Sequence, residues 1–215
     1  MKSFLIIGMG RFGHHITINL ARQGAEIMIV DTDQAKMEDL LSVVTSAKIG
    51  DCTNEEVLKT LGVKNFDMCI VCIGTNFQSS LEITSLLKEM GARHVVSKAT
   101  RDIHAKFLLR NGADEVIYPD RDIAEKLAVS YSSDKIFDYI ELGGNYAIYE
   151  IPVMKEWVGH SIKALNFRSR VNILGTKTGD DRTSLMPTAD YVFEKDVHLL
   201  VVGTREDVLR IIKKI

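Results

Sequence analysis

The chain has 215 residues, enough for one or two domains, and with 46% hydrophobic and 26% charged residues it has the composition of a globular protein. Its formal net charge is −2 and its pI is about 6.3, which argues against a nucleic-acid partner. No apolar run approaches the roughly 18 residues that cross a bilayer, and the N-terminus does not have the pattern of a signal peptide. We therefore expect a cytosolic protein with no direct membrane insertion.

Strand and helix patterns alternate up to about residue 120. Apolar stripes predict helices, for example over Asn76–Met90, and short apolar runs bounded by turn residues predict strands. Strands that alternate with helices are typical of a parallel sheet with right-handed crossovers, so we expect a Rossmann-like, doubly wound α/β domain. The predicted strands are Phe4–Ile7, Glu26–Val30, Val43–Ile49, Met68–Ile73, His94–Ser97 and Glu115–Tyr118.

The pattern changes in the last third of the chain. A helix is predicted over Arg121–Tyr131, and Ser132-Ser133-Asp134 is a break that can cap a further, linker helix before residue 143. We therefore divide the chain into residues 1–133, which include a crossover helix, and residues 134–215, a linker helix with a smaller α+β domain. The elements expected in that domain are a Gly143-Gly144-Asn145 turn, Tyr146–Val153, Ser161–Leu165, Asn172–Thr176, a Gly179-Asp180-Asp181 turn, Val197–Gly203 and Arg205–Lys214.

The three cysteines, Cys52, Cys69 and Cys72, are too few for a disulfide framework. Cys69 and Cys72 have a Cys-x-x-Cys spacing, but they lie in a continuous apolar run that predicts a buried strand. Side chains three apart on a strand point to opposite faces. We therefore expect core cysteines that neither chelate a metal nor form a disulfide.

The motif Gly8-Met9-Gly10-Arg11-Phe12-Gly13 has the spacing Gly-x-Gly-x-x-Gly. It follows the first predicted strand and precedes a helix, which is the context of a dinucleotide-binding turn. In such a turn Gly8 allows the tight bend, Gly10 lets the backbone approach a pyrophosphate and Gly13 lets the helix pack closely on the sheet. The phosphates would then lie on the free N–H groups of the helix N-terminus.

Two charged residues complete this candidate site. Asp31 ends the second predicted strand, where an acid binds the ribose hydroxyls, so that NADP is expected to be the poorer ligand. The alternatives are a fold whose nucleotide site is empty, or Asp31 as a helix cap only. Arg11 adds a guanidinium beside the phosphates, which suits the terminal phosphate of ATP; the alternative is a solvated surface arginine.

Several further motifs resemble the domain that regulates potassium conductance, and most closely the TrkA/KtrA-type subunits of bacterial potassium uptake systems. The likeness covers the whole chain and implies that ATP, ADP or NAD(H) is bound at the glycine-rich turn, with Asp51 facing the adenine. It implies further ligand contacts at Cys52, Thr75, Asn76 and Lys98. The motifs are Gly8–Gly13, Asp31, Gly50-Asp51-Cys52-Thr53, Gly74-Thr75-Asn76, the segment with Lys98 and His104, and Ala113–Pro119.

The same resemblance implies an assembly in which the nucleotide is a signal. Subunits would pair through their crossover helices and form an octameric gating ring under a membrane potassium-translocating subunit. Asp120 would help to hold a divalent cation; the alternative is an N-cap for the helix Arg121–Tyr131. The small domain would bind cyclic di-AMP, or else serve in dimerisation only. The residues matched to that second effector are Arg168, Asn172, Ile173 and Pro187.

The enzymatic alternative is an NAD-dependent oxidoreductase. Tyr131 and Lys135 match the Tyr-x-x-x-Lys pair of short-chain dehydrogenases, but Tyr191 and Lys195 match it as well, so the motif is too short to be specific. The histidines have no metal-ligand spacing, and no catalytic nucleophile is recognisable. We therefore expect a sensor and not an enzyme. A transcriptional regulator would need a basic DNA-binding helix, which the C-terminal part lacks.

Overall fold

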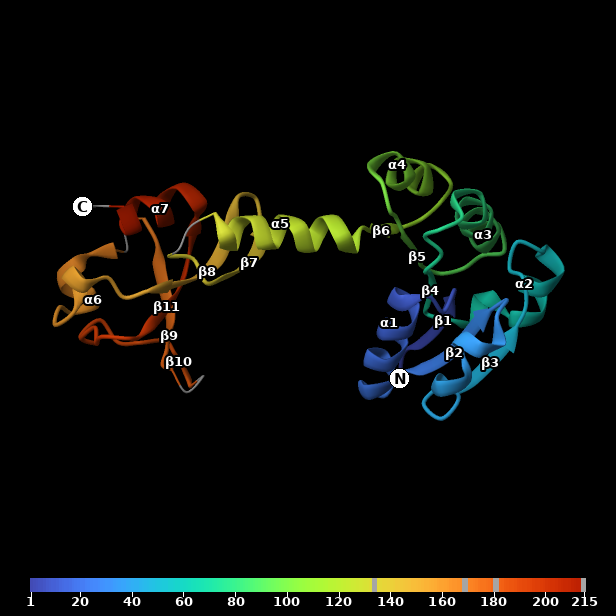
Figure 1. Ribbon diagram of the computed structural model, residues 1–215, viewed down its shortest axis with the longest axis horizontal. Coiled ribbons are helices and arrows are strands. Elements are labelled where there is room, and N and C mark those ends of the chain that lie inside the picture. The colour runs from blue at the N-terminus through green and yellow to red at the C-terminus, as the bar shows by residue number, and fades with distance from the viewer. Residues whose placement is uncertain (133–134, 168–169, 180–181, 214–215) are drawn as a thin grey trace. The chain divides into compact units, whose positions relative to one another are not determined.

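The computed structural model describes residues 1–132, 135–167, 170–179 and 182–213. The chain folds into two compact units, Met1–Arg121 and Asp122–Ile215 (Figure 1). They divide near the start of α5 (Pro119–Tyr131), whereas the domain boundary predicted from the sequence lies after that helix, at residue 133. The assignment of the crossover helix to the first domain stays a prediction.

The first unit contains a six-stranded parallel sheet with the strand order β3-β2-β1-β4-β5-β6. The chain builds outward from β1 to β3, returns to the other side of β1, and builds outward again from β4 to β6. This order confirms the predicted doubly wound α/β fold. The strands are β1 (Ser3–Ile7), β2 (Glu26–Asp31), β3 (Ser46–Ile49), β4 (Met68–Val71), β5 (Val95–Lys98) and β6 (Glu115–Ile117).

Apolar layers cover both faces of this sheet. One layer packs the strands against α1 and two 3-10 turns, and the other packs them against α2 and α3. Cys72 belongs to the first layer and Cys69 to the second, so the expected opposite orientation of these side chains is confirmed. The helices and turns of this unit are α1 (Arg11–Arg22), η1 (Gln34–Lys36), η2 (Glu38–Leu40), α2 (Glu55–Leu61), η3 (Val63–Asn65), α3 (Phe77–Glu89) and α4 (Asp102–Arg110).

The three cysteines are buried and free. Burial in apolar surroundings disfavours a thiolate and raises the pKa of each thiol to about 12. As predicted, they serve as core residues.

The second unit contains a five-stranded sheet, order β10-β9-β11-β8-β7, whose strands all pair antiparallel. Its core gathers residues of β8 and β11, the apolar face of α7, Trp157 and Phe193. This confirms a second, smaller α+β domain. Its elements are β7 (Asp138–Gly143), β8 (Tyr146–Pro152), η4 (Lys155–Trp157), α6 (Ile162–Leu165), β9 (Asn172–Lys177), β10 (Thr183–Leu185), β11 (His198–Thr204) and α7 (Arg205–Lys213).

The predicted linker helix before residue 143 is wrong, because β7 lies there. Gly143, Gly144 and Asn145 have φ values of 89°, 61° and 70°, and this left-handed run reverses the chain tightly. The residues before it therefore pair with β8, with Tyr139 directly opposite Tyr149. The short strand β10 was not predicted. Asp180 and Asp181 of the expected turn lie outside the described residues.

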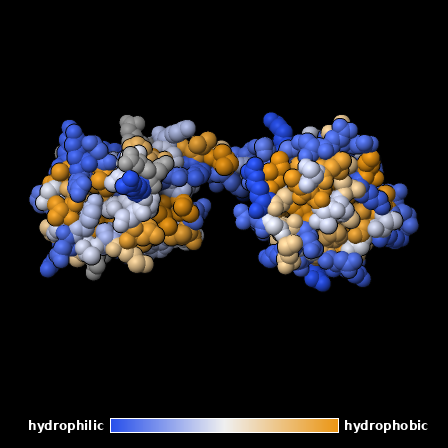
Figure 2. Space-filling view, turned by 90° about the horizontal axis from the view of Figure 1, so that it is seen from below, coloured by the Kyte–Doolittle hydropathy of each residue, from blue (hydrophilic) through white to orange (hydrophobic). Residues whose placement is uncertain are grey.

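The surface combines polar and apolar regions. On the face seen in Figure 2, apolar residues gather in the middle of the first unit and hydrophilic residues surround them. Helix α5 buries none of its side chains, and its exposed residues include Ile123, Leu127 and Tyr131, spaced four apart. Among the described residues, no helix has both the length and the apolar character of a membrane span.

Candidate functional site

A cleft of about 620 Å³ opens at the carboxyl ends of β1, β2, β4 and β5. This lies beside the switch between the two halves of the sheet, where ligands lie in open α/β folds. Its size is that of a small-molecule site. The sequence-predicted residues that line it are Gly8, Gly10, Arg11, Phe12, Asp31, Asp51, Cys52, Thr75, Asn76, Lys98 and Asp120.

The glycine-rich turn brings the start of α1 against the end of β1. Gly8 has φ +95°, a conformation that favours glycine. A Cβ on Gly13 would lie 2.0 Å from the carbonyl oxygen of Gly8, so no side chain fits between the turn and the helix. A Cβ on Gly10 would instead meet no described residue within 4 Å. Gly13 therefore lies beneath the cleft, while Gly10 borders open space.

Helix α1 begins at Arg11, with Gly10 as its N-cap residue in an extended conformation. The first α-helical hydrogen bond runs from His14 N to Gly10 O, at 2.9 Å. The N–H groups of Arg11, Phe12 and Gly13 therefore have no acceptor within the helix. Together with the positive end of the helix dipole, they form a site suited to an anionic group such as a phosphate.

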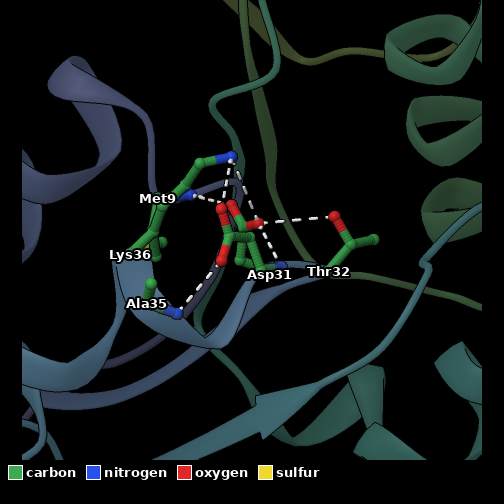
Figure 3. Close-up of polar contacts among 6 residues, drawn as sticks. Met9, Asp31, Thr32, Ala35 and Lys36 are labelled. Atoms are coloured by element: carbon green, nitrogen blue, oxygen red, sulfur yellow. Dashed lines mark hydrogen bonds and ion pairs between the residues drawn. The ribbon is translucent and has the colours of Figure 1, made fainter.

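Asp31 joins the end of β2 to the glycine-rich turn (Figure 3). Its Oδ2 accepts a hydrogen bond from Met9 N at 2.6 Å, and its Oδ1 accepts one from Asp33 N at 2.9 Å. The Nζ of Lys36 lies 3.8 Å from the same carboxylate. Because each carboxylate oxygen can accept more than one hydrogen bond, Asp31 retains capacity for a sugar hydroxyl while it holds the turn in place.

Two other predicted contacts also make local hydrogen bonds. The Oδ1 of Asp51 accepts from the N–H and the hydroxyl of Thr53, at 2.9 and 2.7 Å, and these bonds lower the pKa of Asp51. Asn76 is the N-cap of α3, and its Oδ1 accepts from Ser79 N at 3.1 Å. These side chains therefore fix their own turns at the edge of the cleft.

The free positive charges of the cleft are Arg11 and Lys98. In the described part of the chain, no carboxylate lies within 4.0 Å of either side-chain cation. The Nζ of Lys98 lies 5.5 Å from the ring centre of Phe12, so the aromatic ring is its contact within the cleft. These cations and the open end of α1 favour an anionic ligand.

Sequence reasoning missed several lining residues, namely Thr32, Lys36, Thr53, Ser79 and Thr100. Thr32 and Thr100 follow the ends of strands β2 and β5 by one and two residues, and this position was the available signal. Lys36 had no such signal, because η1 alone carries it back toward Asp31.

Asp120 lies in the first turn of α5, which begins at Pro119, and it also lines the cleft. The described residues include no group of three or more His, Cys, Asp or Glu side chains that could hold a metal ion. One carboxylate does not suffice for Ca²⁺ or Mg²⁺, so a cation here would need further oxygen ligands from a bound phosphate and water.

The residues matched to a second effector lie on and near β9. Asn172 is exposed at the start of β9, and Ile173 is half-buried opposite Val201 of β11. Pro187 follows Met186, whose φ is +58°. Arg168 lies outside the described residues.

The model of the TrkA-N domain family matches residues 4–119, and that of the TrkA-C domain family matches residues 146–215. The Ktr system potassium uptake protein C of Bacillus subtilis (strain 168) is 37% identical over 216 residues, which cover 100% of this chain and 97% of that protein. The Ktr system potassium uptake protein A of the same organism is 36% identical, with 97% and 95% covered.

Solved structures share the fold. The GsuK channel bound to NAD superposes with a TM-score of 0.67 at 19% identity, over 96% of this chain and 38% of that one. The Kef C-terminal domain of Shewanella denitrificans in its AMP-bound form superposes with a TM-score of 0.53 at 25% identity, over 61% of this chain and 80% of that one.

Proposed function

The chain belongs to the family of TrkA- and Ktr-type potassium uptake proteins, with a TrkA-N and a TrkA-C domain, and we propose that it senses an adenine nucleotide and gates a membrane partner. The family is regulatory and non-catalytic, so the chain is not an enzyme. The oxidoreductase alternative is set aside on this ground.

The glycine-rich cleft carries this proposal. It combines three features that an adenine nucleotide requires: unpaired N–H groups at the start of α1 for phosphate, the Asp31 carboxylate for ribose hydroxyls, and the cations Arg11 and Lys98. Relatives of this fold are bound to NAD and to AMP. ATP or ADP and NAD(H) remain the two candidate classes of ligand.

Calorimetric titration of the purified protein with ATP, ADP, NAD and NADH tests the proposal. We expect at least one of them to bind with a Kd below about 100 μM, which corresponds to roughly −5.5 kcal/mol. Absence of binding for all four up to about 1 mM would overturn it. Repeating the titration with and without Mg²⁺, in wild type and Asp120→Asn, tests whether Asp120 contributes to a cation site.

Arg11 is expected to distinguish the ligands. Arg11 is the first residue of α1, and its side chain is exposed and lines the cleft. In the described chain, its guanidinium has no carboxylate partner. We expect Arg11→Ala to weaken ATP binding more than ADP or NAD binding, by about tenfold, the effect of one lost charge-assisted hydrogen bond of roughly 1.5 kcal/mol. His15→Ala, a neighbouring exposed residue, is the control. An equal loss for the three ligands would make Arg11 a general phosphate contact.

The partner we propose is a membrane potassium-translocating subunit. Copies of this chain would pair through α5 and form a ring that binds this subunit on its cytosolic side. The relatives are named as components of potassium uptake systems. The exposed apolar residues of α5, among them Ile123 and Leu127, are consistent with a helix that becomes buried when two copies of the chain pair. Light scattering of the purified protein tests the assembly; a monomer at all concentrations would contradict it.

We further propose that the TrkA-C domain binds cyclic di-AMP through Asn172 and the residues matched with it. An exposed amide such as that of Asn172 can pair with an adenine edge. In equilibrium dialysis, we expect wild type to retain labelled cyclic di-AMP and Asn172→Ala to retain at least tenfold less. Equal retention by both would move the ligand to another site, and no retention at micromolar ligand would leave the domain with assembly only.

A further inference from the structure

Two neighbouring helices begin at the edge of the cleft. Asn76 caps α3, and Thr100 lies just before α4; both line the cleft. In the first turn of α4, the imidazole of His104 packs on the ring of Phe77, the first residue of α3, with ring centres 4.8 Å apart. Helices α3 and α4 lie side by side in Figure 1, and this aromatic contact joins their first turns.

His104 is only 1% exposed, yet neither of its ring nitrogens has a hydrogen-bond partner among the residues that the structure describes. The only other buried side-chain atom without a partner in the described chain is the hydroxyl of Ser80, in the first turn of α3. Both orphaned groups therefore lie on the two helices that begin at the cleft. A buried polar group without a partner opposes burial, so these groups lower the free-energy cost of local opening in the two helices.

The surroundings of His104 disfavour its protonation. Burial, and then the positive charge of Arg101 just before α4, hold the pKa of His104 below its ordinary value of 6.5. Phe77 and Ser80 of α3 are uncharged. The acid next to Arg101 on α4, Asp102, lies 3.4 Å from Arg121 of α5 and is paired with it. No carboxylate in the described residues forms an ion pair with His104.

We propose that His104 is a positioning residue that makes the nucleotide site sensitive to acid. The neutral imidazole fits between α3 and α4 and keeps Asn76 and Thr100 in place. The protonated imidazolium needs hydration, so it favours a form in which the first turns of the two helices are separated. Because its pKa is lower in the closed form than in an opened form, the closed form is fully favoured above about pH 6.5. Below that pH the opening constant rises, by at most tenfold per pH unit.

The proposal concerns regulation of the site proposed above, but its first test needs no ligand. Hydrogen exchange of the amides in the first turns of α3 and α4, corrected for the intrinsic pH dependence, gives the opening constant between pH 7.5 and 5.5. For wild type we expect a rise of about fivefold or more over this range. His104→Phe, which keeps an aromatic ring against Phe77, should show no rise. His160→Phe, at an exposed histidine of the other unit, should behave as wild type.

A second variant keeps the test decisive if His104→Phe does not fold. Arg101 is exposed, and Arg101→Gln removes a charge that opposes protonation of His104 in the closed form. The pKa of His104 in the closed form then lies nearer to that in the opened form, so the rise in the opening constant should be smaller than in wild type. An opening constant that is independent of pH in wild type, or that rises equally in wild type and His104→Phe, would overturn the proposal.

Titration with NAD links the opening to binding. NAD is the suitable probe because its pyrophosphate does not change charge between pH 5.5 and 7.5. In wild type, we expect the affinity for NAD to decrease as the pH is lowered from 7.5 to 5.5. In His104→Phe, we expect it to stay constant over this range. Unchanged NAD affinity in wild type at pH 5.5 would overturn the link, whereas absence of NAD binding at pH 7.5 would count against NAD as the ligand and leave the exchange result to decide on His104.

Discussion

Gly13→Ala is expected to destabilise the first unit by about 3 kcal/mol or more, because the new methyl group has no space. Its Cβ would lie 2.0 Å from the carbonyl oxygen of Gly8 and 3.2 Å from Cβ of Cys72. The first of these atoms is backbone and cannot move away as a flexible side chain can. To accommodate the methyl group, α1 would have to move from the sheet and take its open N-terminus with it. Urea unfolding followed by circular dichroism measures the loss.

Gly10→Ala is the matched control for this substitution. Gly10 has φ −69°, which alanine adopts freely, and its Cβ would meet nothing within 4 Å in the described part of the chain. We expect the stability of Gly10→Ala to lie within about 1 kcal/mol of wild type and its nucleotide affinity to be lower, because the methyl group fills space that the phosphates need. Equal destabilisation by both substitutions would contradict the close packing of α1 at Gly13.

Asp31→Ala is expected to reduce nucleotide affinity by roughly 10- to 100-fold, the effect of losing hydrogen bonds to a charged acceptor, about 1.5–3 kcal/mol. The unit should remain folded. It should be less stable, however, because the carboxylate also accepts from Met9 N and Asp33 N. Calorimetry with the nucleotide that wild type binds measures the first effect, and urea unfolding measures the second.

Asp33→Ala separates a general change of charge from the specific role of Asp31. Asp33 lies two residues further on, half-exposed, and caps η1 by accepting from Ala35 N. Its removal changes the charge of the rim equally, so we expect affinity within about twofold of wild type. If both variants bind as wild type does, Asp31 holds the turn only, and ribose is bound elsewhere.

The residues of the cleft could be predicted because they depend on local rules. Glycines at Gly8 and Gly13 mark a positive φ and a close approach, and the ends of neighbouring parallel strands necessarily meet at one edge of the sheet. Asp31 was found by its distance along the chain from the glycines. The hydrogen bonds of Asp31 to Met9 N and of Asp51 to Thr53 could not be predicted, because they depend on side-chain orientation within each turn.

The part of the fold that was missed depends on contacts distant in sequence. The segment of β7 is a strand because Gly143 and Gly144 reverse the chain onto β8, and its own alternation is too short to exclude a helix. Lys36 reaches the cleft through η1, a turn without a strong sequence signature. His104 was noted in the sequence only as part of a family likeness; its burial without a polar partner is a property of the packed helices alone.

The distribution of the thiols gives the protein a built-in reporter. Cys52, Cys69 and Cys72 all belong to the first unit, and the sequence contains no other cysteine. Each is at most 5% exposed and has a pKa near 12, so a thiol reagent at neutral pH reacts only after the unit opens. The labelling rate of the full-length chain therefore follows opening of the glycine-rich unit, which for the cleft-lining Cys52 and Cys72 includes local opening at the cleft, without contribution from the second unit. A nucleotide that binds the cleft would slow the labelling in proportion to its occupancy, and an effector of the TrkA-C domain would slow it only if the two units are energetically coupled.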